Sequence, residues 1–319
     1  MPSQRHRPTA RLGMATAVLV LALTSCSSSD GKADDTAKEP PVGNVPALLD
    51  STSLRFPLDV YMPTAQQRGT LNEAQDMLID QCMKRYGYRF AVRKQGRSSG
   101  DNARRYGVSS AAAAERDGYD NPEVNKTEQK PAQQALGPNE KLVLNGKDKV
   151  NPSDPVPMSQ EEAEQTGKGA ITVGGQKVPA GGCLREGYLK LYAPKKDSVD
   201  IMVPQNFGFD AYSRSREDSR VRKAIKAWSA CMKKHGYTTD DPVSPQDDLG
   251  FDDGALGSPK AMTAARQDVS CKRKTNLVGI WFTVETAYQK RLIEQNAETL
   301  DSVKKQLDAR LRLAAQLTS

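Results

Sequence analysis

The chain has 319 residues, with 46 lysines and arginines against 39 aspartates and glutamates, which gives a net charge of +7. Its first 25 residues hold three arginines and no acidic residue, so the rest of the chain carries only +4. This excess is too small to indicate nucleic-acid binding, for which basic charge is concentrated on one face. Five cysteines and only two histidines, His6 and His235, further restrict the metal and nucleophilic chemistry available.

Residues 1–25 have the pattern of an export signal that is removed from the mature protein. Three arginines precede an apolar run from Met14 to Leu23, which is the order of a charged n-region and a short hydrophobic h-region. A bilayer core needs about 20 apolar residues to span it. The run is therefore predicted to be a targeting segment rather than a transmembrane anchor.

The four residues that follow this run, Leu23-Thr24-Ser25-Cys26, resemble the lipobox of bacterial lipoproteins. The resemblance implies that Cys26 becomes the mature N-terminus and carries a diacylglyceryl group. Each buried methylene contributes about 0.8 kcal/mol, so two or more acyl chains anchor stably where one does not. The implied location is the extracytoplasmic face of the cell membrane. The alternative is a free cysteine that stands at this position by chance.

The mature chain is predicted to consist of a tether and one folded domain. Residues 26–45 contain mostly Ser, Asp, Lys and Pro, with few apolar side chains to bury, and such segments remain flexible. Residues 46–319 are predicted to form a single, mainly helical domain. An alternative interpretation is that this domain consists of two pseudo-repeated halves, about 46–193 and 205–319, because the two halves contain similar cysteine segments.

The first predicted helices follow from capping patterns. Thr70-Leu71-Asn72-Glu73 is a capping-box sequence, and the apolar residues after it recur at helical spacing, so a helix is predicted from 71 to 86. A short helix capped by Ser109 or Ser110 comes next. Residues 119–158 have few apolar groups and many Pro, Asn, Gln and Lys, which predicts a long loop.

The middle of the chain is predicted to hold one hairpin between helices. Ser159 begins another capping box, for a short helix that Gly167 ends. Two β-rich runs within 170–178 flank Gly174-Gly175, the strongest hairpin signal in the chain. A further helix is predicted from Cys183.

The remainder is predicted to be helical. A long amphipathic helix is expected from 210 to 235, an acidic loop over 238–257 and a helix from Ser258. In the last segment, 277–317, apolar residues recur about every 3.7 residues, whereas a left-handed coiled coil requires 3.5. A continuous helix of this length would extend about 60 Å, so we expect one or two long amphipathic helices, with a bend near Asn296 or a projecting end.

Four cysteines lie beyond Cys26, and their pattern predicts disulfides. An even number in an exported chain favours bridges, since that compartment is oxidising, and the absence of any C-x-x-C pair disfavours a four-cysteine zinc site. Three pairings are formally possible. The segment "QCMKRYGYRF" at 81–90 matches "ACMKKHGYTT" at 230–239, and the symmetric pairing of these two copies is Cys82–Cys183 with Cys231–Cys271.

His235 follows Cys231 by four positions, which places both on one face of a helix. Such a pair could share a metal or lower the pKa of the thiol. In the other copy, however, the position of His235 is occupied by Tyr86, which supports neither role in the same way. Both copies instead have the pattern of a helix end, with a glycine at the left-handed position and a tyrosine that folds back over a methionine. The structural interpretation is therefore preferred.

Two charged clusters have both a functional and a structural interpretation. Lys272-Arg273-Lys274 is interpreted as a solvated helix end rather than a ligand site. Hard oxygen ligands in an extracellular loop can bind calcium weakly, but the aspartates of the acidic loop lack the spacing of an EF-hand, so an ordinary solvated loop is preferred. These aspartates are Asp240, Asp241, Asp247, Asp248, Asp252 and Asp253.

No catalytic constellation is evident in the sequence. A serine or cysteine hydrolase would have to use His235 as its base, and no G-x-S-x-G elbow occurs. The glycine pairs "VGGQ" and "AGGC" lack the pattern of a phosphate-binding loop. Paired carboxylates for glycoside hydrolysis remain possible, because any two of the 39 acidic residues could converge.

The lipobox, the tether, the paired helix ends and the stretch "DVSCKRKTNLVGIW" are similar to uncharacterised exported lipoproteins of high-GC actinobacteria. This resemblance covers the mature chain loosely and only the cysteine contexts specifically, and it implies a location but no activity. The predicted function is a non-catalytic binding or scaffolding lipoprotein of the cell envelope, with a wall component or a membrane protein as partner and no nucleic acid or cofactor. The alternative is a wall-active hydrolase that uses Asp and Glu carboxylates.

Overall fold

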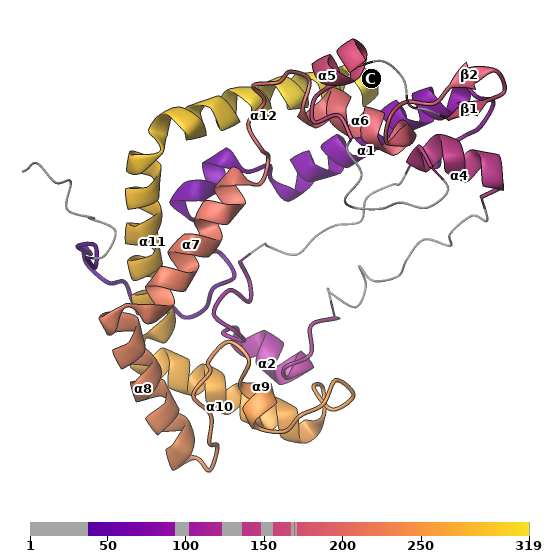
Figure 1. The fold of residues 1–319 in the computed structure, drawn as a ribbon. Helices are drawn as coiled ribbons and strands as arrows, with labels where there is room; N and C mark the ends of the chain where they lie inside the picture. Colours follow the sequence, from indigo (N-terminus) through magenta and orange to yellow (C-terminus); the bar gives the residue numbers. More distant parts are fainter. Residues whose placement is uncertain are drawn as a thin grey trace, which may run out of the picture. The chain divides into compact units, whose positions relative to one another are not determined.

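The structure is a computed structural model that describes residues 38–92, 102–122, 136–147, 156–166, 169 and 171–318. The predicted export signal, Cys26 and most of the predicted tether lie outside the described residues. Residues from Pro40 onward form one unit, and the following description concerns this unit (Figure 1). Within the described residues, no helix is both long enough and apolar enough to cross a membrane.

The fold is mainly helical, as predicted, with one small hairpin. In chain order the elements are the 3-10 helix η1 (Pro57–Tyr61), then α1 (Ala65–Lys84), α2 (Ala111–Asp117), α4 (Pro138–Asn145), α5 (Gln160–Thr166), β1 (Thr172–Val173), β2 (Gln176–Lys177), α6 (Gly182–Tyr192), α7 (Val203–Glu217), α8 (Ser219–Lys234), α9 (Pro245–Asp248), α10 (Pro259–Thr275), α11 (Leu277–Gln295) and α12 (Ala297–Thr318).

The predicted hairpin is confirmed. β1 and β2 pair antiparallel, with Thr172 opposite Lys177. Gly174 and Gly175 form the turn with φ of +56° and +78°, the left-handed region that two-residue hairpin turns of this kind require. Val173 is buried and joins the hydrophobic cluster between the hairpin, α1 and α6.

Both predicted disulfides are present. Cys82–Cys183 joins α1 to α6 and closes a separation of 101 residues, and Cys231–Cys271 joins α8 to α10 over 40 residues. By chain entropy, loops of these lengths stabilise the folded state by about 4 to 5 kcal/mol each.

The helix ends before the two matching glycines have the predicted geometry. Gly87 and Gly236 have φ of +80° and +85°. The amide of Tyr88 donates to the Met83 carbonyl, and in the second copy the amide of Tyr237 donates to the carbonyl of Met232, both at 3.1 Å. These are the long-range bonds of a Schellman motif, so the repeated sequence encodes a repeated helix end.

The start of α1 differs from the prediction. The helix begins at Ala65 because Thr64, not Thr70, is its cap: the Thr64 hydroxyl accepts a hydrogen bond from the Gln67 amide, and the Gln67 side chain accepts one from the Thr64 amide. The second capping-box sequence therefore lies inside a helix that has already begun. A capping pattern marks a possible helix start. The sequence here contains two, and the prediction used the one at Thr70 instead of the earlier one at Thr64.

Two further boundary predictions are wrong. The helix predicted over 210–235 is divided into α7 and α8 at Asp218, which caps α8 by accepting from the Arg220 amide at 3.0 Å. The loop predicted over 119–158 contains α4, which begins with Pro138 and ends at Gly146 in the left-handed conformation. The burial of Val143 and Leu144 in the cluster with Cys82 and Cys183 explains why so short a helix forms.

The C-terminal segment bends at Asn296, which was one of the two predicted alternatives; the other was a projecting end. α11 ends and α12 begins there, and the two helices run in clearly different directions in Figure 1. Leu307 and Ala314 of α12 are buried with Leu71 and Leu78 of α1. The last helix thus packs on one of the first, so the two ends of the described domain stabilise each other.

Asp80 of α1 is expected to make the stability of the fold depend on pH. Its buried carboxylate accepts hydrogen bonds from the amide of Phe90 at 2.9 Å and from Arg89 at 3.0 Å, and it pairs with Lys84 at 2.8 Å. Burial opposes ionisation, but these partners outweigh it and lower the pKa of Asp80 to about 2. A carboxyl with a depressed pKa stabilises the fold above its unfolded pKa and loses this contribution as the pH falls.

We expect Asp80→Asn to be less stable than the parent at pH 7, by up to about 2 kcal/mol. The difference should shrink as the pH falls from about 4 to 2. Chemical denaturation at a series of pH values measures it, with Asp301→Asn on the exposed face of α12 as the control for lost charge. A difference that stays constant over this range would contradict the assignment.

Candidate functional site

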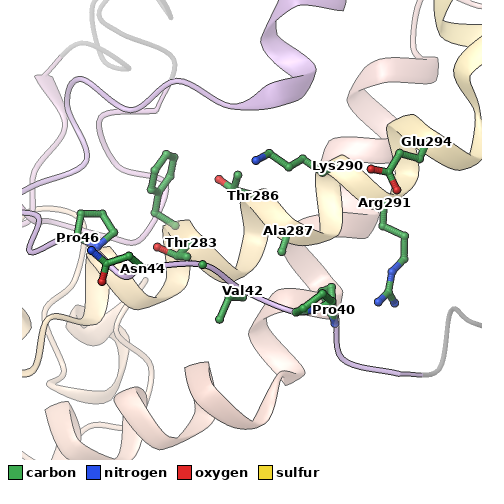
Figure 2. A pocket seen from close by; sticks show the side chains of 13 residues that line it. Pro40, Val42, Asn44, Pro46, Thr283, Thr286, Ala287, Lys290, Arg291 and Glu294 are labelled. Atoms are coloured by element: carbon green, nitrogen blue, oxygen red, sulfur yellow. The ribbon is translucent and has the colours of Figure 1, made fainter.

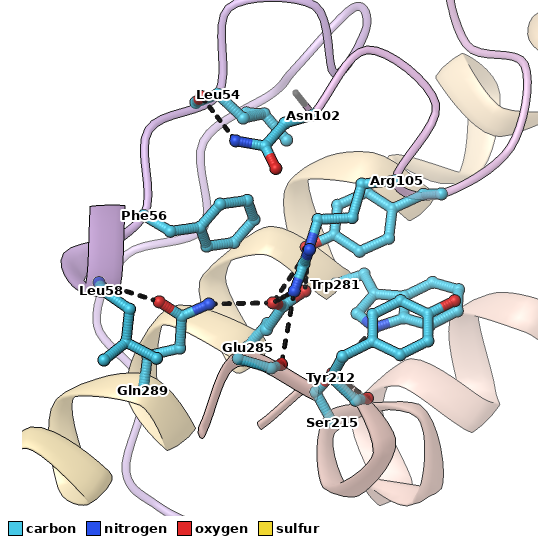
Figure 3. A network of polar contacts seen from close by, with 12 residues as sticks. Leu54, Phe56, Leu58, Asn102, Arg105, Tyr212, Ser215, Trp281, Glu285 and Gln289 are labelled. Atoms are coloured by element: carbon cyan, nitrogen blue, oxygen red, sulfur yellow. Dashed lines mark hydrogen bonds and ion pairs between the residues drawn. The ribbon is translucent and has the colours of Figure 1, made fainter. Parts of the chain in front are cut away.

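A buried polar network surrounds Glu285 of α11 (Figure 3). The guanidinium of Arg105 donates to both oxygens of the Glu285 carboxylate, with Nε distances of 2.9 and 3.1 Å. The hydroxyl of Tyr106 donates to the same carboxylate at 2.7 Å. Gln289 donates to it at 3.0 Å and accepts from the amide of Leu58 at 3.1 Å. One carboxylate therefore connects η1, the segment at 105–106 and α11.

Aromatic rings enclose this network. The Arg105 guanidinium lies 4.8 Å from the ring centre of Phe56 and 5.3 Å from that of Tyr212. Trp281 stacks on Tyr106 and Tyr212 with centroid distances of 4.8 and 5.4 Å. Burial together with the neighbouring Glu285 raises the pKa of Tyr106 well above its ordinary value, so its proton is retained as a hydrogen-bond donor. The network is fully bonded internally, which indicates a structural role.

The second buried ion pair overturns one sequence interpretation. Lys272 was predicted to belong to a solvated helix end, but its side chain is 1% exposed. Its ammonium group pairs with Asp268 at 3.0 Å and donates to the Val108 carbonyl at 2.8 Å. Trp228 donates to the other oxygen of Asp268 at 2.9 Å. Burial raises the pKa of Asp268 to about 6 and lowers that of Lys272. Only Arg273 and Lys274 of the basic cluster are exposed.

Asp218 and Glu186 are buried acids whose pKa values shift in the opposite direction from that of Asp268. Asp218 pairs with Arg220 at 2.6 Å, and Glu186 pairs with Lys190 at 2.6 Å and with Arg85. Burial opposes the ionisation of both carboxyls, but hydrogen bonds and the nearby cations outweigh it and lower the pKa of each. These carboxylates join segments of the chain and are not arranged as an acid and base facing a cleft.

A groove of about 500 Å³ lies between α11 and the extended segment 40–48, which we call the strap (Figure 2). The sequence prediction assigned residues 40–45 to the tether, yet Pro40 is buried and Val42 packs against the central hydrophobic cluster. The difference arises because α11 provides apolar surface that a short segment rich in Pro and Val can cover.

The strap is held at both ends. The Pro40 carbonyl accepts a hydrogen bond from Arg220 at 3.0 Å. At the other end Asn276 donates to the Pro46 carbonyl at 3.0 Å and accepts from the Leu48 amide at 3.2 Å. A Cβ on Gly279 would lie only 2.1 Å from the Pro46 carbonyl oxygen, so glycine is required where the strap crosses α11. The groove is thus a built feature of the fold.

The chemistry of the groove is apolar along its length, with polar groups at intervals. Its walls are formed by Pro40, Pro41, Val42, Gly43, Asn44 and Pro46 of the strap and by Phe282, Thr283, Thr286, Ala287, Lys290, Arg291 and Glu294 of α11. Within the described part of the chain, the buried hydroxyl of Thr286 has no hydrogen-bond partner. Lys290 and Arg291 lie toward one end of the groove, where Glu294 offsets part of their positive charge.

A smaller groove of about 280 Å³ lies between α6 and the segment 195–201. Tyr188 and Tyr192 line it, but Arg185 lies over the first ring at 5.2 Å and Arg310 over the second at 5.6 Å. Because each ring already has a cation over one face, the pair makes a poor open platform for stacking against a sugar.

The sites proposed from the sequence have different outcomes. Cys26 lies outside the described residues. Cys231, His235 and Cys271 lie together, with one potential ligand atom from each within 4.8 Å of the others, and the two sulfurs are joined as a disulfide. Within the described ranges the aspartates of the acidic loop form no comparable group. Asp248 instead accepts from the Thr239 hydroxyl at 2.8 Å, and Asp241 pairs with Arg216 at 3.2 Å.

Sequence reasoning missed both the Glu285 network and the groove. Glu285 stands in "FTVETAYQK" as an ordinary helical glutamate, and nothing local indicates that Arg105 contacts it. One weak signal exists, since the glutamate falls next to Val284 and near Trp281 on the apolar side of α11. A charged residue on such a face is rarely buried unless it is paired.

Comparison with models of protein families, with curated proteins and with solved structures finds no match for this chain.

Glu285→Gln should destabilise the protein by about 3 to 5 kcal/mol, because it leaves the Arg105 guanidinium partly buried without its counter-charge. Glu294→Gln, which changes an exposed glutamate of the same helix, should change stability by less than about 0.5 kcal/mol. Denaturant unfolding of the two variants beside the parent measures both. Equal effects would show that the network contributes little.

Proposed function

We propose that this protein is a cell-envelope lipoprotein, anchored by lipid on Cys26 at the extracytoplasmic face of the cell membrane, that binds a partner without chemical turnover. The observation that carries the binding role is the groove between the strap and α11. It combines apolar walls with amide, hydroxyl and charged side chains. Binding sites of this size are commonly apolar with a few convergent polar groups.

The position of the groove in the chain supports a partner close to the membrane. Pro40, the first residue of the strap, follows Cys26 by 14 residues, which extend at most about 50 Å. If Cys26 is lipidated, the groove stays within that distance of the membrane surface. This favours a segment of a membrane protein over a distant layer of the wall.

The chemistry of the groove favours an extended peptide with an acidic residue. Prolines and aliphatic side chains on one wall and a helix on the other suit a narrow chain, and Lys290 and Arg291 suit a carboxylate. A wall glycan is the alternative ligand, but it is less well suited to a groove without an exposed aromatic platform.

A wall hydrolase that uses Asp and Glu carboxylates is less well supported. Retaining and inverting glycosidases need two carboxyl groups about 5 to 9.5 Å apart across a cleft. The buried carboxylates described above are ion-paired inside the domain, and the larger groove has Glu294 as its one acidic lining residue. Release of sugar fragments from purified wall by the protein would restore this alternative.

The anchor is tested by fractionating cells that express the full chain or Cys26→Ala. We expect the parent in the membrane fraction with an acylated N-terminal peptide by mass spectrometry, and the variant in the soluble extracytoplasmic fraction. Recovery of both forms in the membrane fraction would contradict lipid anchoring through Cys26.

The groove is tested with a matched pair of substitutions. Ala287→Trp should fill the groove. Binding of the lipidated protein is measured to isolated membranes that contain their envelope proteins and to protein-free lipid vesicles, which report binding through the lipid alone. We expect the variant to lose at least about tenfold of the parent's preference for the protein-containing membranes. Ala309→Trp adds the same side chain at an exposed position of α12 and should leave binding unchanged. Equal binding by the two variants would exclude the groove, and selective binding to purified wall would identify the glycan alternative.

A further inference from the structure

The end of α8 carries a second feature, which is independent of the anchor and of the groove. Cys231 lies in the last turn of α8, His235 directly follows the helix, and Cys271 lies on α10, which packs against it. One potential ligand atom from each of the three lies within 4.8 Å of the other two. Cys231 is half-buried, His235 is exposed and Cys271 is buried. The group therefore has one side open to solvent.

These three side chains match the ligands that zinc prefers. Two thiolates and one imidazole are three of the four ligands of a tetrahedral zinc site, and the open position takes a water. Zinc bound to two sulfurs at about 2.3 Å would hold them about 3.8 Å apart. The sulfurs are bonded to each other in the disulfide, so after reduction they must move apart to this separation, and rotation of the two cysteine side chains, whose Cα atoms lie 5.7 Å apart, can supply the movement.

A neighbouring side chain already bonds to one of the sulfurs. The Gln267 amide, one turn earlier on α10, donates to Cys271 Sγ at 3.4 Å. Donors of this kind orient a sulfur ligand and stabilise its thiolate form. The lysines next to His235 are exposed, and the charge of two thiolates offsets that of a divalent cation, so these lysines oppose binding only weakly.

We propose that Cys231, His235 and Cys271 form a zinc site that is closed by the disulfide and opened by its reduction. A dithiol reductant gives two electrons and two protons to the Cys231–Cys271 bond, which yields two thiols and the oxidised reductant. Zn²⁺ then binds both sulfurs and the imidazole, and the two thiol protons are released to solvent. The bound ion replaces the bridge as the link between α8 and α10.

The other disulfide of the chain provides an internal comparison. Cys82 and Cys183 are 2% and 0% exposed, so a reductant reaches them less readily. The position that matches His235 is Tyr86, whose hydroxyl donates to the Lys177 carbonyl at 2.7 Å. The residue at this position in the first copy thus has a structural contact. His235 has no hydrogen bond or ion pair to the described residues, so its imidazole is available for a metal.

The test uses the purified full chain, oxidised or treated with a phosphine reductant, and Co²⁺ as a spectroscopic probe for Zn²⁺. Differential alkylation with mass spectrometry shows which bridge is open, and circular dichroism reports whether the domain is folded. We expect Cys231–Cys271 to be reduced first, and the reduced protein to bind one Co²⁺ with thiolate charge-transfer and tetrahedral d–d bands that Zn²⁺ displaces. The oxidised protein should show neither band.

The matched variant is His235→Tyr, which introduces the residue that the first helix end already carries and should therefore fold. We expect it to keep the disulfide and to bind Zn²⁺ after reduction more than about tenfold more weakly than the parent. The proposal is overturned if the reduced, folded parent shows no cobalt bands, if His235→Tyr gives the same bands and affinity, or if the reduced parent unfolds even with Zn²⁺ present. Equal binding by the oxidised parent would also overturn it, since the ion would then lie elsewhere.

Discussion

The carboxylate of Glu285 is the constraint on which the arrangement of this domain most depends. It is fully buried, and an isolated charge in that position would cost several kcal/mol. The charge is tolerated because Arg105, Tyr106 and Gln289 all donate to it. Arg105 and Tyr106 lie about 180 residues before Glu285 in the sequence, so the buried carboxylate has all its hydrogen bonds only when the chain around 105–106 is in place. The network therefore makes a local helix dependent on a distant loop.

Side chains in the other buried ion pairs also join segments that are distant in the sequence. They explain how short helices with small apolar clusters adopt one spatial arrangement. Lys272 reaches from α10 to the Val108 carbonyl, and Arg220 joins the cap of α8 to Pro40 of the strap. Each contact replaces a nonspecific apolar surface with a directional bond that is satisfied in one arrangement only. The strap beside the groove is positioned by polar bonds at its ends and by the packing of Val42 against the central hydrophobic cluster between them.

Local features of the fold could be predicted from the sequence, and features made by contacts between distant segments could not. The repeated "CMK" segments identified both helix ends and both disulfides, because a glycine at the left-handed position is a local constraint and an even number of cysteines beyond Cys26 can be counted. The break at Asp218 and the helix α4 do have local signals, a capping aspartate in one case and Pro138 with Gly146 in the other, which the prediction overlooked. The burial of Lys272 has no such signature. Lys272 reads as part of a basic run, and only the packing of α10 against Asp268, Trp228 and Val108 removes it from solvent.

Comparison of the two repeated helix ends shows which residues the helix end requires and which it does not. Both copies keep the glycine, the tyrosine and the methionine that the Schellman motif uses, and both place a disulfide one turn earlier. Tyr86 and His235 occupy the same place in this motif, so the motif itself does not require either residue. Tyr86 is accounted for by its bond to the hairpin. His235 has no such bond among the described residues, and its position beside the more accessible bridge is the part of the second copy that helix termination leaves unexplained.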